Sequence, residues 1–123
     1  MTLTVTDVNR NSSTCTATTT VQDNVTPIAN CTNVTVQLNA SGNGSVTSGQ
    51  VNNGSTDNCA IASLSVSPST FNCNNVGANT VTLTVTDVNN NSSTCTATAT
   101  VQDNIAPNAN CQNVTVQLNS SGV

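Results

Sequence analysis

The sequence predicts an all-β protein built from tandem repeats of 80 residues. Two observations lead to this prediction: Val, Leu and Thr alternate strictly in several short runs, and residues 2–42 recur as residues 82–122. Side chains point alternately to the two faces of a strand, so alternation with period two is typical of a strand with one buried face. Val and Thr are also β-branched, which favours strands.

The clearest strand pair lies between Thr80 and Asp103. In the two arms of this stretch, threonines alternate with the apolar residues Val81, Leu83 and Val85, and then Cys95, Ala97, Ala99 and Val101. The connection between the arms, residues 87–93, is rich in Asn and Ser, which are turn residues. The stretch is therefore predicted to be a β-hairpin with one apolar face and one threonine face.

The internal repeat sets the domain boundaries. Residues 2–42 align with residues 82–122 without a gap and differ at only seven positions. Self-similarity at a fixed period indicates a repeat architecture. Junctions are predicted near Pro27 and Pro107, because proline lacks a backbone donor and favours an extended residue before it. The expected units are the end of one repeat (1–24), a complete repeat (25–104) and the start of another (105–123).

Within the complete repeat, short runs alternate with turn signals. Strands are expected around residues 34–38, 46–51 and 61–66, and Phe71 and Val76 flank Cys73. Turns or loops are expected at residues 39–44, 52–58, 67–69 and 77–79. Short strands with turn signals every eight to twelve residues are typical of a β-sandwich or barrel. An immunoglobulin-like β-sandwich is the expected fold, with repeats stacked end to end.

The composition argues against several functions. Arg10 is the only basic residue, and the chain contains no His, Lys, Glu, Trp or Tyr. One arginine cannot neutralise a nucleic-acid backbone, so no nucleic-acid partner is expected. No run of about 20 apolar residues is present, so no membrane insertion is expected. A general base would have to be a lone aspartate, so the sequence does not predict an enzyme.

The cysteines point to disulfides rather than to zinc. There is no C-x-x-C pair and no His, so zinc-ligand spacing is absent. Four cysteines of the complete repeat allow three pairings. In an immunoglobulin-like fold the first and last strands are neighbours, which favours a disulfide between Cys31 and Cys95. Cys59 and Cys73 lie on either side of the turn at residues 67–69, which favours a disulfide across that hairpin. Cys15 and Cys111 would then pair with cysteines outside the chain. The alternative to the whole disulfide framework is that the cysteines are buried reduced thiols.

The aspartates suggest a cation site. Asp87-x-Asn89-x-Asn91 resembles the first half of a calcium-binding loop, although the following Gly and the closing Glu are missing. In an immunoglobulin-like sandwich this loop, the loop with Asp57 and the incoming linker with Asp23 share one end. A calcium site is therefore expected at each junction, with the ligand candidates Asp23, Asn24, Asp57, Asp87, Asn89 and Asn91. The alternative is that these residues only cap turns.

The hairpin stretch, the Val-Gln-Asp-Asn-Ile-Ala-Pro linker and the Ser-Thr-Asp-Asn-Cys-Ala-Ile loop resemble hyalin-repeat immunoglobulin-like domains. They are most similar to tandem repeats of giant secreted surface adhesins of gliding bacteria. The resemblance implies export to the cell surface and a long stalk of near-identical domains. The expected function is a structural stalk repeat of an extracellular adhesin or filament, stapled by disulfides and rigidified by calcium.

Two other roles remain open at the level of sequence. Outward threonines on neighbouring strands form a regular hydroxyl array, which is compatible with a glycan-binding or ice-binding module. Edge strands with few charges are also poorly protected against pairing. Neighbouring identical repeats are the expected partners, and lateral association of stalks into filaments is a further expectation.

Overall fold

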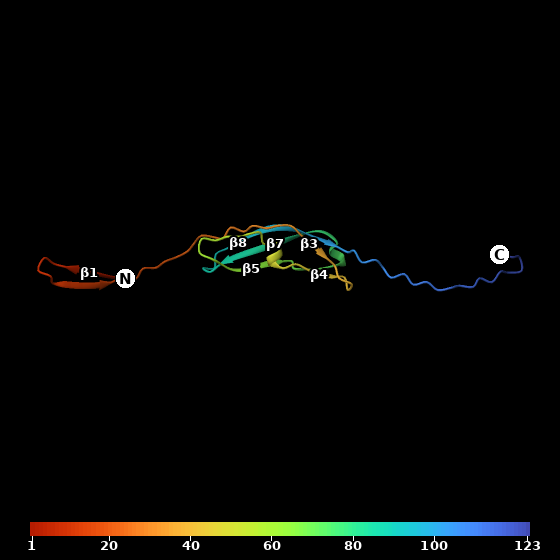
Figure 1. Cartoon of the computed structure of the whole chain (residues 1–123), viewed down its shortest axis with the longest axis horizontal. Coiled ribbons are helices and arrows are strands. Elements are labelled where there is room, and N and C mark those ends of the chain that lie inside the picture. Colours follow the sequence, from red (N-terminus) through yellow and green to blue (C-terminus); the bar gives the residue numbers. More distant parts are fainter.

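The computed structural model describes all 123 residues and contains a β-rich body flanked by a separate hairpin and an extended tail (Figure 1). The strands are β1 (Thr2–Thr6), β2 (Ser12–Thr16), β3 (Val34–Gln37), β4 (Asn43–Ser45), β5 (Ile61–Ser67), β6 (Thr70–Asn72), β7 (Gly77–Asp87) and β8 (Ser92–Gln102). Helical structure is limited to α1 (Ser48–Val51) and the 3-10 turn η1 (Cys73–Asn75). The predicted all-β class is confirmed. With a single α-helix of four residues, no helix is long enough to cross a bilayer.

The hairpin of β7 and β8 is the centre of the fold. The two strands pair antiparallel along their length, from Gly77 opposite Val101 to Thr86 opposite Ser92. The apolar face is buried, as the alternation predicts, while the threonines on the other face are exposed or half-buried. The predicted turn at residues 77–79 is wrong, because these residues already belong to β7. Gly77 still has the positive φ of a turn residue, at 110°.

The larger sheet has the strand order β3-β8-β7-β5. Its edge strand β3 pairs parallel with β8, so the first and last strands of the body are neighbours, as expected. Before β3, the chain makes isolated β-bridges with the connection between α1 and β5, at Ile28 with Thr56 and at Cys31 with Asn52. The same segment also contacts β8, so it lies between that strand and the connection after α1.

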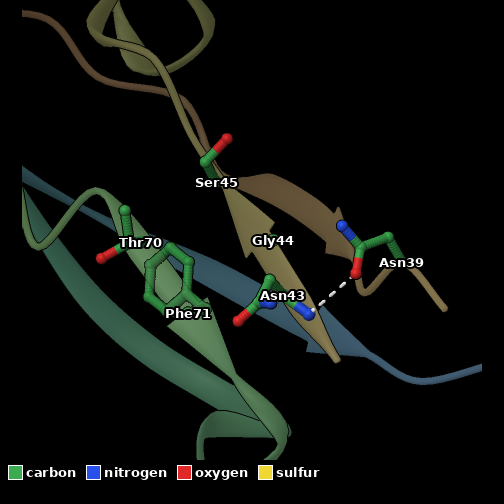
Figure 2. A pocket seen from close by; sticks show the side chains of 6 residues that line it. All are labelled: Asn39, Asn43, Gly44, Ser45, Thr70 and Phe71. Atoms are coloured by element: carbon green, nitrogen blue, oxygen red, sulfur yellow. Dashed lines mark hydrogen bonds between the residues drawn. The ribbon is translucent and has the colours of Figure 1, made fainter. Parts of the chain in front are cut away.

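A smaller sheet consists of β4 and β6, with Gly44 opposite Phe71 (Figure 2). The turn before β4 is held by Asn39, whose side-chain oxygen accepts from the backbone N–H of Asn43 at 3.1 Å. A Cβ on Gly44 would stand 2.6 Å from the side chain of Val36. Glycine at this position therefore allows β4 to approach β3 closely.

One hydrophobic core lies between these layers. Its 11 buried residues come from both sheets, from α1 and from the positions directly after β3 and β4, and they are Val36, Leu38, Val46, Val51, Phe71, Val81, Leu83, Val85, Ala97, Ala99 and Val101. Phe71, the only aromatic residue of the chain, is among them. All of these residues lie within the range 25–104.

The strand predicted over residues 46–51 is wrong, because residues 48–51 form α1 instead. Thr47 caps this helix, and its side chain accepts from the backbone N–H of Gln50 while the Gln50 side chain accepts from the Thr47 N–H. Such a reciprocal capping box satisfies two helix-start donors. The apolar residues Val46 and Val51 are buried all the same.

The two flanking segments expose residues whose counterparts in the body are buried. Leu3 on β1 is 59% exposed, whereas Leu83 at the same position of the repeat is 0% exposed. Val116 is 78% exposed, whereas its counterpart Val36 is 5% exposed. The flanking segments therefore carry the apolar pattern of the body without the layers that cover it.

Candidate metal centre

Three carboxylates gather where the incoming chain meets the body. Asp23, Asp57 and Asp87 each offer an oxygen, and these oxygens all lie within 4.8 Å of one another. Asp23 lies in the incoming linker, Asp57 in the loop before β5, and Asp87 at the end of β7. The structure thus brings together the three aspartates that the sequence analysis placed at one end of the fold.

Asp87 is positioned by its own loop. Its Oδ1 accepts from the backbone N–H groups of Asn89 and Asn91 at 2.8 Å each, and its Oδ2 accepts from the Asn91 side chain at 2.8 Å. Asn90 between them has a φ of 69°, a left-handed conformation that Asn tolerates better than most residues. Asp87 itself is 1% exposed, so this carboxylate is held in a defined place inside the protein.

The same loop forms in the flanking hairpin, where the rest of the body is absent. There Asp7 accepts from the N–H groups of Asn9 and Asn11 at 2.8 and 2.9 Å. Hydrogen bonds from the side chain and backbone of Asn11 lower the pKa of Asp7. The loop geometry is therefore encoded locally, by the Asp-x-Asn-x-Asn spacing.

Asp57 leaves one oxygen without a partner. Its Oδ2 accepts from the backbone N–H groups of Cys59 and Ala60 at 2.8 and 3.2 Å. Its Oδ1 is buried and has no hydrogen-bond partner. A buried carboxylate oxygen without a donor is energetically unfavourable, because it has lost its hydrogen bonds to water and has no hydrogen bond within the protein. A cation at the centre of the cluster would satisfy this oxygen.

Asp23 ties the linker to the body. Its Oδ1 accepts from the Val25 N–H at 3.1 Å and from the Asn58 side chain at 3.2 Å, and its Oδ2 accepts from the Asn89 side chain at 3.0 Å. The Asn91 side chain donates to the Asp23 backbone carbonyl at 3.0 Å. The Val25 N–H, with the Asn89 and Asn58 amides, lowers the pKa of Asp23 to about 2. Asp23 is therefore ionised at neutral pH.

The asparagine candidates behave differently from the aspartates. Asn89 and Asn91 direct their amide nitrogens at Asp23 and Asp87, so in this arrangement they donate hydrogen bonds and hold the carboxylates in place. Rotation of either amide by 180° would present its oxygen instead. Asn24 is exposed. Sequence reasoning missed Asn58, although its position next to Asp57 in the same loop was a signal for it.

The local charge also affects Cys59. A hydrogen bond to Asp23, partial loss of solvation, and the negative charges of Asp23, Asp57 and Asp87 raise the pKa of this thiol. Like charges this close repel one another unless a cation lies among them. The donors are carboxylate oxygens from three separate segments, which suit a hard cation such as calcium. Chemically, the arrangement can hold a divalent ion and thereby link the linker to two loops.

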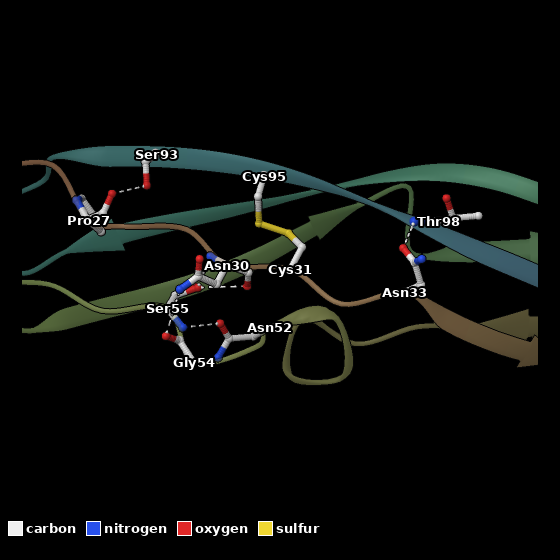
Figure 3. The surroundings of a disulfide bond; sticks show 10 residues. All are labelled: Pro27, Asn30, Cys31, Asn33, Asn52, Gly54, Ser55, Ser93, Cys95 and Thr98. Carbon is white, nitrogen blue, oxygen red and sulfur yellow. Dashed lines mark hydrogen bonds between the residues drawn. A yellow bond between two sulfur atoms is a disulfide. The ribbon is translucent and has the colours of Figure 1, made fainter.

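Cys31 and Cys95 form a disulfide, with a Cα–Cα distance of 5.9 Å (Figure 3). Two hydrogen bonds to β8 flank it: the Ser93 hydroxyl donates to the Pro27 carbonyl at 2.6 Å, and the Thr98 N–H donates to the Asn33 side chain at 2.9 Å. The segment before β3 is thus tied to the last strand at three points. The predicted Cys31–Cys95 pairing is confirmed.

The predicted Cys59–Cys73 bridge is not formed, and both thiols are free and exposed. The prediction treated the strands on either side of residues 67–69 as a hairpin. Instead, β5 pairs with β7 in the larger sheet and β6 pairs with β4 in the smaller one. Cys59 therefore lies beside Asp57, while the Cys73 sulfur lies 3.8 Å from the Gly42 carbonyl oxygen. Cys15 and Cys111 are also free.

Comparisons with protein-family models, with curated proteins and with solved structures find no match to this chain.

Proposed function

We propose that this chain is a stretch of an extracellular structural stalk, in which immunoglobulin-like repeats stack end to end and are stiffened by calcium at each junction. The observation that carries the proposal is the contrast between equivalent positions. Leu83 and Val36 are buried in the body, whereas Leu3 and Val116 are exposed in the flanking segments. Burying one such side chain contributes about 1.5–3 kcal/mol. The flanking segments are therefore suited to complete further copies of the same body.

The arrangement of strands supports an immunoglobulin-like sandwich. Two sheets enclose one core, and the first strand β3 runs parallel to the last strand β8. The incoming and outgoing chains meet the body at opposite ends (Figure 1). Repeats with this arrangement add length when they are linked in tandem, and each repeat contacts only its neighbours.

The disulfide supports an extracellular location, because such bonds persist in oxidising compartments. An adhesin or surface filament of the kind found in gliding bacteria is the proposed setting, following the sequence resemblance. The proposed partners are neighbouring identical repeats, with lateral association of stalks as a second level of assembly. No charged side chain lies on the exposed edge strand β3, so charge does not guard that edge.

The stalk is tested by small-angle X-ray scattering on proteins of two, three and four repeats. The longest dimension should increase by a constant amount with each added repeat. A dimension that grows only slowly with repeat number would mean that the repeats fold back on one another, and would contradict the stalk.

Calcium at the junction is tested by isothermal titration and thermal unfolding of the 123-residue chain. Calcium at 100 times its dissociation constant should stabilise the body by about 2.7 kcal/mol. Asp23→Asn should abolish most of this effect. Asp103→Asn is the matched control, because Asp103 makes the same 3.1 Å bond to the second following N–H but lies outside the cluster. Equal losses in the two variants, or no calcium response in the parent chain, would contradict the site.

A glycan-binding or ice-binding module is a second candidate function, favoured by the outer face of the larger sheet. Threonines face one another across β7 and β8, at Thr82 with Thr96 and at Thr84 with Thr94. Serines of β5 extend the same face, with Ser65 opposite Thr84. Glycan arrays and ice-recrystallisation assays test this face, with Thr84→Val and Thr96→Val as the variants. Adhesion that disappears with these variants while the fold persists would favour the binding module over the stalk.

A further inference from the structure

We propose that a disulfide links consecutive repeats, joining Cys73 of one repeat to the residue equivalent to Cys59 in the following repeat. This inference rests on the tandem array proposed above, but it requires no calcium. It assigns a role to the two exposed thiols of the body that the Cys31–Cys95 bridge leaves free.

The two thiols lie at opposite ends of the body. Cys59 belongs to the end where β7 finishes at Asp87, and Cys73 belongs to the end where β7 begins at Gly77. A strand of 11 residues spans about 35 Å. The sulfurs of one repeat therefore cannot meet, whereas each is placed to face a neighbouring repeat.

At the incoming end, Cys59 lies against the linker. The Asn58 side-chain nitrogen is 3.2 Å from the Asp23 carboxylate and 3.6 Å from the Cys59 sulfur. One amide group thus bridges the thiol and the linker aspartate. Wherever the linker aspartate lies in an array, the thiol equivalent to Cys59 lies beside it.

At the outgoing end, Cys73 lines a cleft of about 340 Å³ together with the next linker. The other walls are the turn at residues 39–42 and the linker residues Asp103, Ile105, Ala106 and Pro107. Asp103 is the counterpart of Asp23 in the repeat. Cys73 and the linker aspartate of the following repeat therefore share one cleft.

The two linkers have the same local structure, which allows one junction to be read from the other. The Val25 N–H donates to Asp23 and the Ile105 N–H donates to Asp103, each at 3.1 Å. A following repeat that holds Asp103 as this repeat holds Asp23 would bring its loop equivalent to Asn58–Cys59 to the cleft. The occupant of the cleft is then that loop, and its thiol meets Cys73.

Bond formation follows ordinary thiol–disulfide exchange. The thiolate of one cysteine attacks a sulfur of an oxidant disulfide, such as that of an oxidoreductase or of oxidised glutathione, and releases one thiol. The second cysteine then attacks the mixed disulfide and releases the other thiol. Two S–H bonds and one S–S bond are exchanged for one new S–S bond and two S–H bonds on the reduced oxidant. The same class of oxidant serves Cys31–Cys95.

The test uses a longer protein in which residues 1–122 are followed by a copy of residues 43–104. Because Gly122 is equivalent to Gly42, this copy completes a second repeat. Cys15→Ser removes a thiol that takes no part in the junction. The junction variant also carries Cys59→Ser in the first repeat and Cys73→Ser in the second. The matched control instead carries Cys73→Ser in the first repeat and Cys59→Ser in the second. Its two remaining unpaired thiols therefore lie at the outer ends of the two-repeat protein, away from the junction. Both variants contain the same number of cysteines.

After oxidation with a glutathione buffer, the junction variant should be a monomer with no reactive thiol, and the control should retain two. Digestion at aspartate residues should release the peptide with Cys73 of the first repeat linked to the peptide with the Cys59 equivalent of the second repeat, from the junction variant alone, whereas the pairs linked by the within-repeat disulfides appear in both variants. Two reactive thiols in a junction variant whose within-repeat disulfides have formed, or bonds only between separate molecules, would overturn the inference. If that variant still scatters X-rays as a two-repeat rod, the stalk stands without the bridge.

Discussion

Removal of the Cys31–Cys95 disulfide should destabilise the body by about 4 kcal/mol. The bridge joins residues separated by 64 positions, and the chain-entropy relation assigns a loop of this size about 4 kcal/mol at 25 °C. For a domain of 60–100 residues, each kcal/mol lowers the melting temperature by about 4–8 °C. The double variant Cys31→Ser, Cys95→Ser should therefore melt roughly 15–30 °C below the parent chain. The core has only 11 buried apolar residues, of which one is aromatic, so a loss of this size is a large fraction of the stability of the body.

Far-UV circular dichroism during urea and thermal unfolding measures this loss, since the chain has no Trp or Tyr for fluorescence. The control is the double variant Cys15→Ser, Cys111→Ser, whose thiols are free and exposed and whose loss should leave stability unchanged. A loss below about 1 kcal/mol in the Cys31, Cys95 variant would refute the entropic argument. Equal losses in both double variants would show that cysteine removal acts by some other route.

Three further outcomes are expected. Leu83→Ala should lower the free energy of unfolding in urea by about 3 kcal/mol or more, because Leu83 is fully buried. Leu3→Ala, at the equivalent position but 59% exposed, should change it by less than about 0.5 kcal/mol. Equal effects would mean that the flanking hairpin is packed. In calcium-free buffer, the pKa of about 2 for Asp23 lies below its ordinary value of 3.8, so the stability that Asp23 contributes is complete above pH 3.8 and is lost as the pH falls towards 2. Melting temperatures measured across this pH range should therefore drop less steeply for Asp23→Asn than for the parent chain. An equal slope in the two proteins would contradict the lowered pKa of Asp23. Gly42→Ala should lower the free energy of unfolding by about 2 kcal/mol, because it adds strain at a φ of 75° and places a Cβ 2.7 Å from the Cys73 sulfur. Gly122→Ala carries the same strain at a φ of 78°, but Gly122 lies in the exposed tail outside the core, so the melting of the body should not change. The reverse order would contradict the packing of the turn at Gly42.

Local patterns predicted the parts of the site that depend on neighbours in sequence. The Asp-x-Asn-x-Asn loop forms at Asp7 and at Asp87 with nearly the same hydrogen bonds, because its donors lie two and four residues away. The direction of an amide group depends on what surrounds it. In this structure Asn89 and Asn91 therefore donate hydrogen bonds to Asp23 and Asp87, an orientation that the spacing alone does not specify.

The sequence by itself determined the all-β class, the apolar face of the β7–β8 hairpin and the recurrence of residues 2–42 as residues 82–122, because alternation and self-similarity are properties of the chain alone. Only the tertiary structure decided which sheet each short strand joins. Alternation reports a buried face and not a partner, so β5 and β6 read as a hairpin, although they belong to different sheets. That assignment separates Cys59 from Cys73 and places each of them at an end of the body.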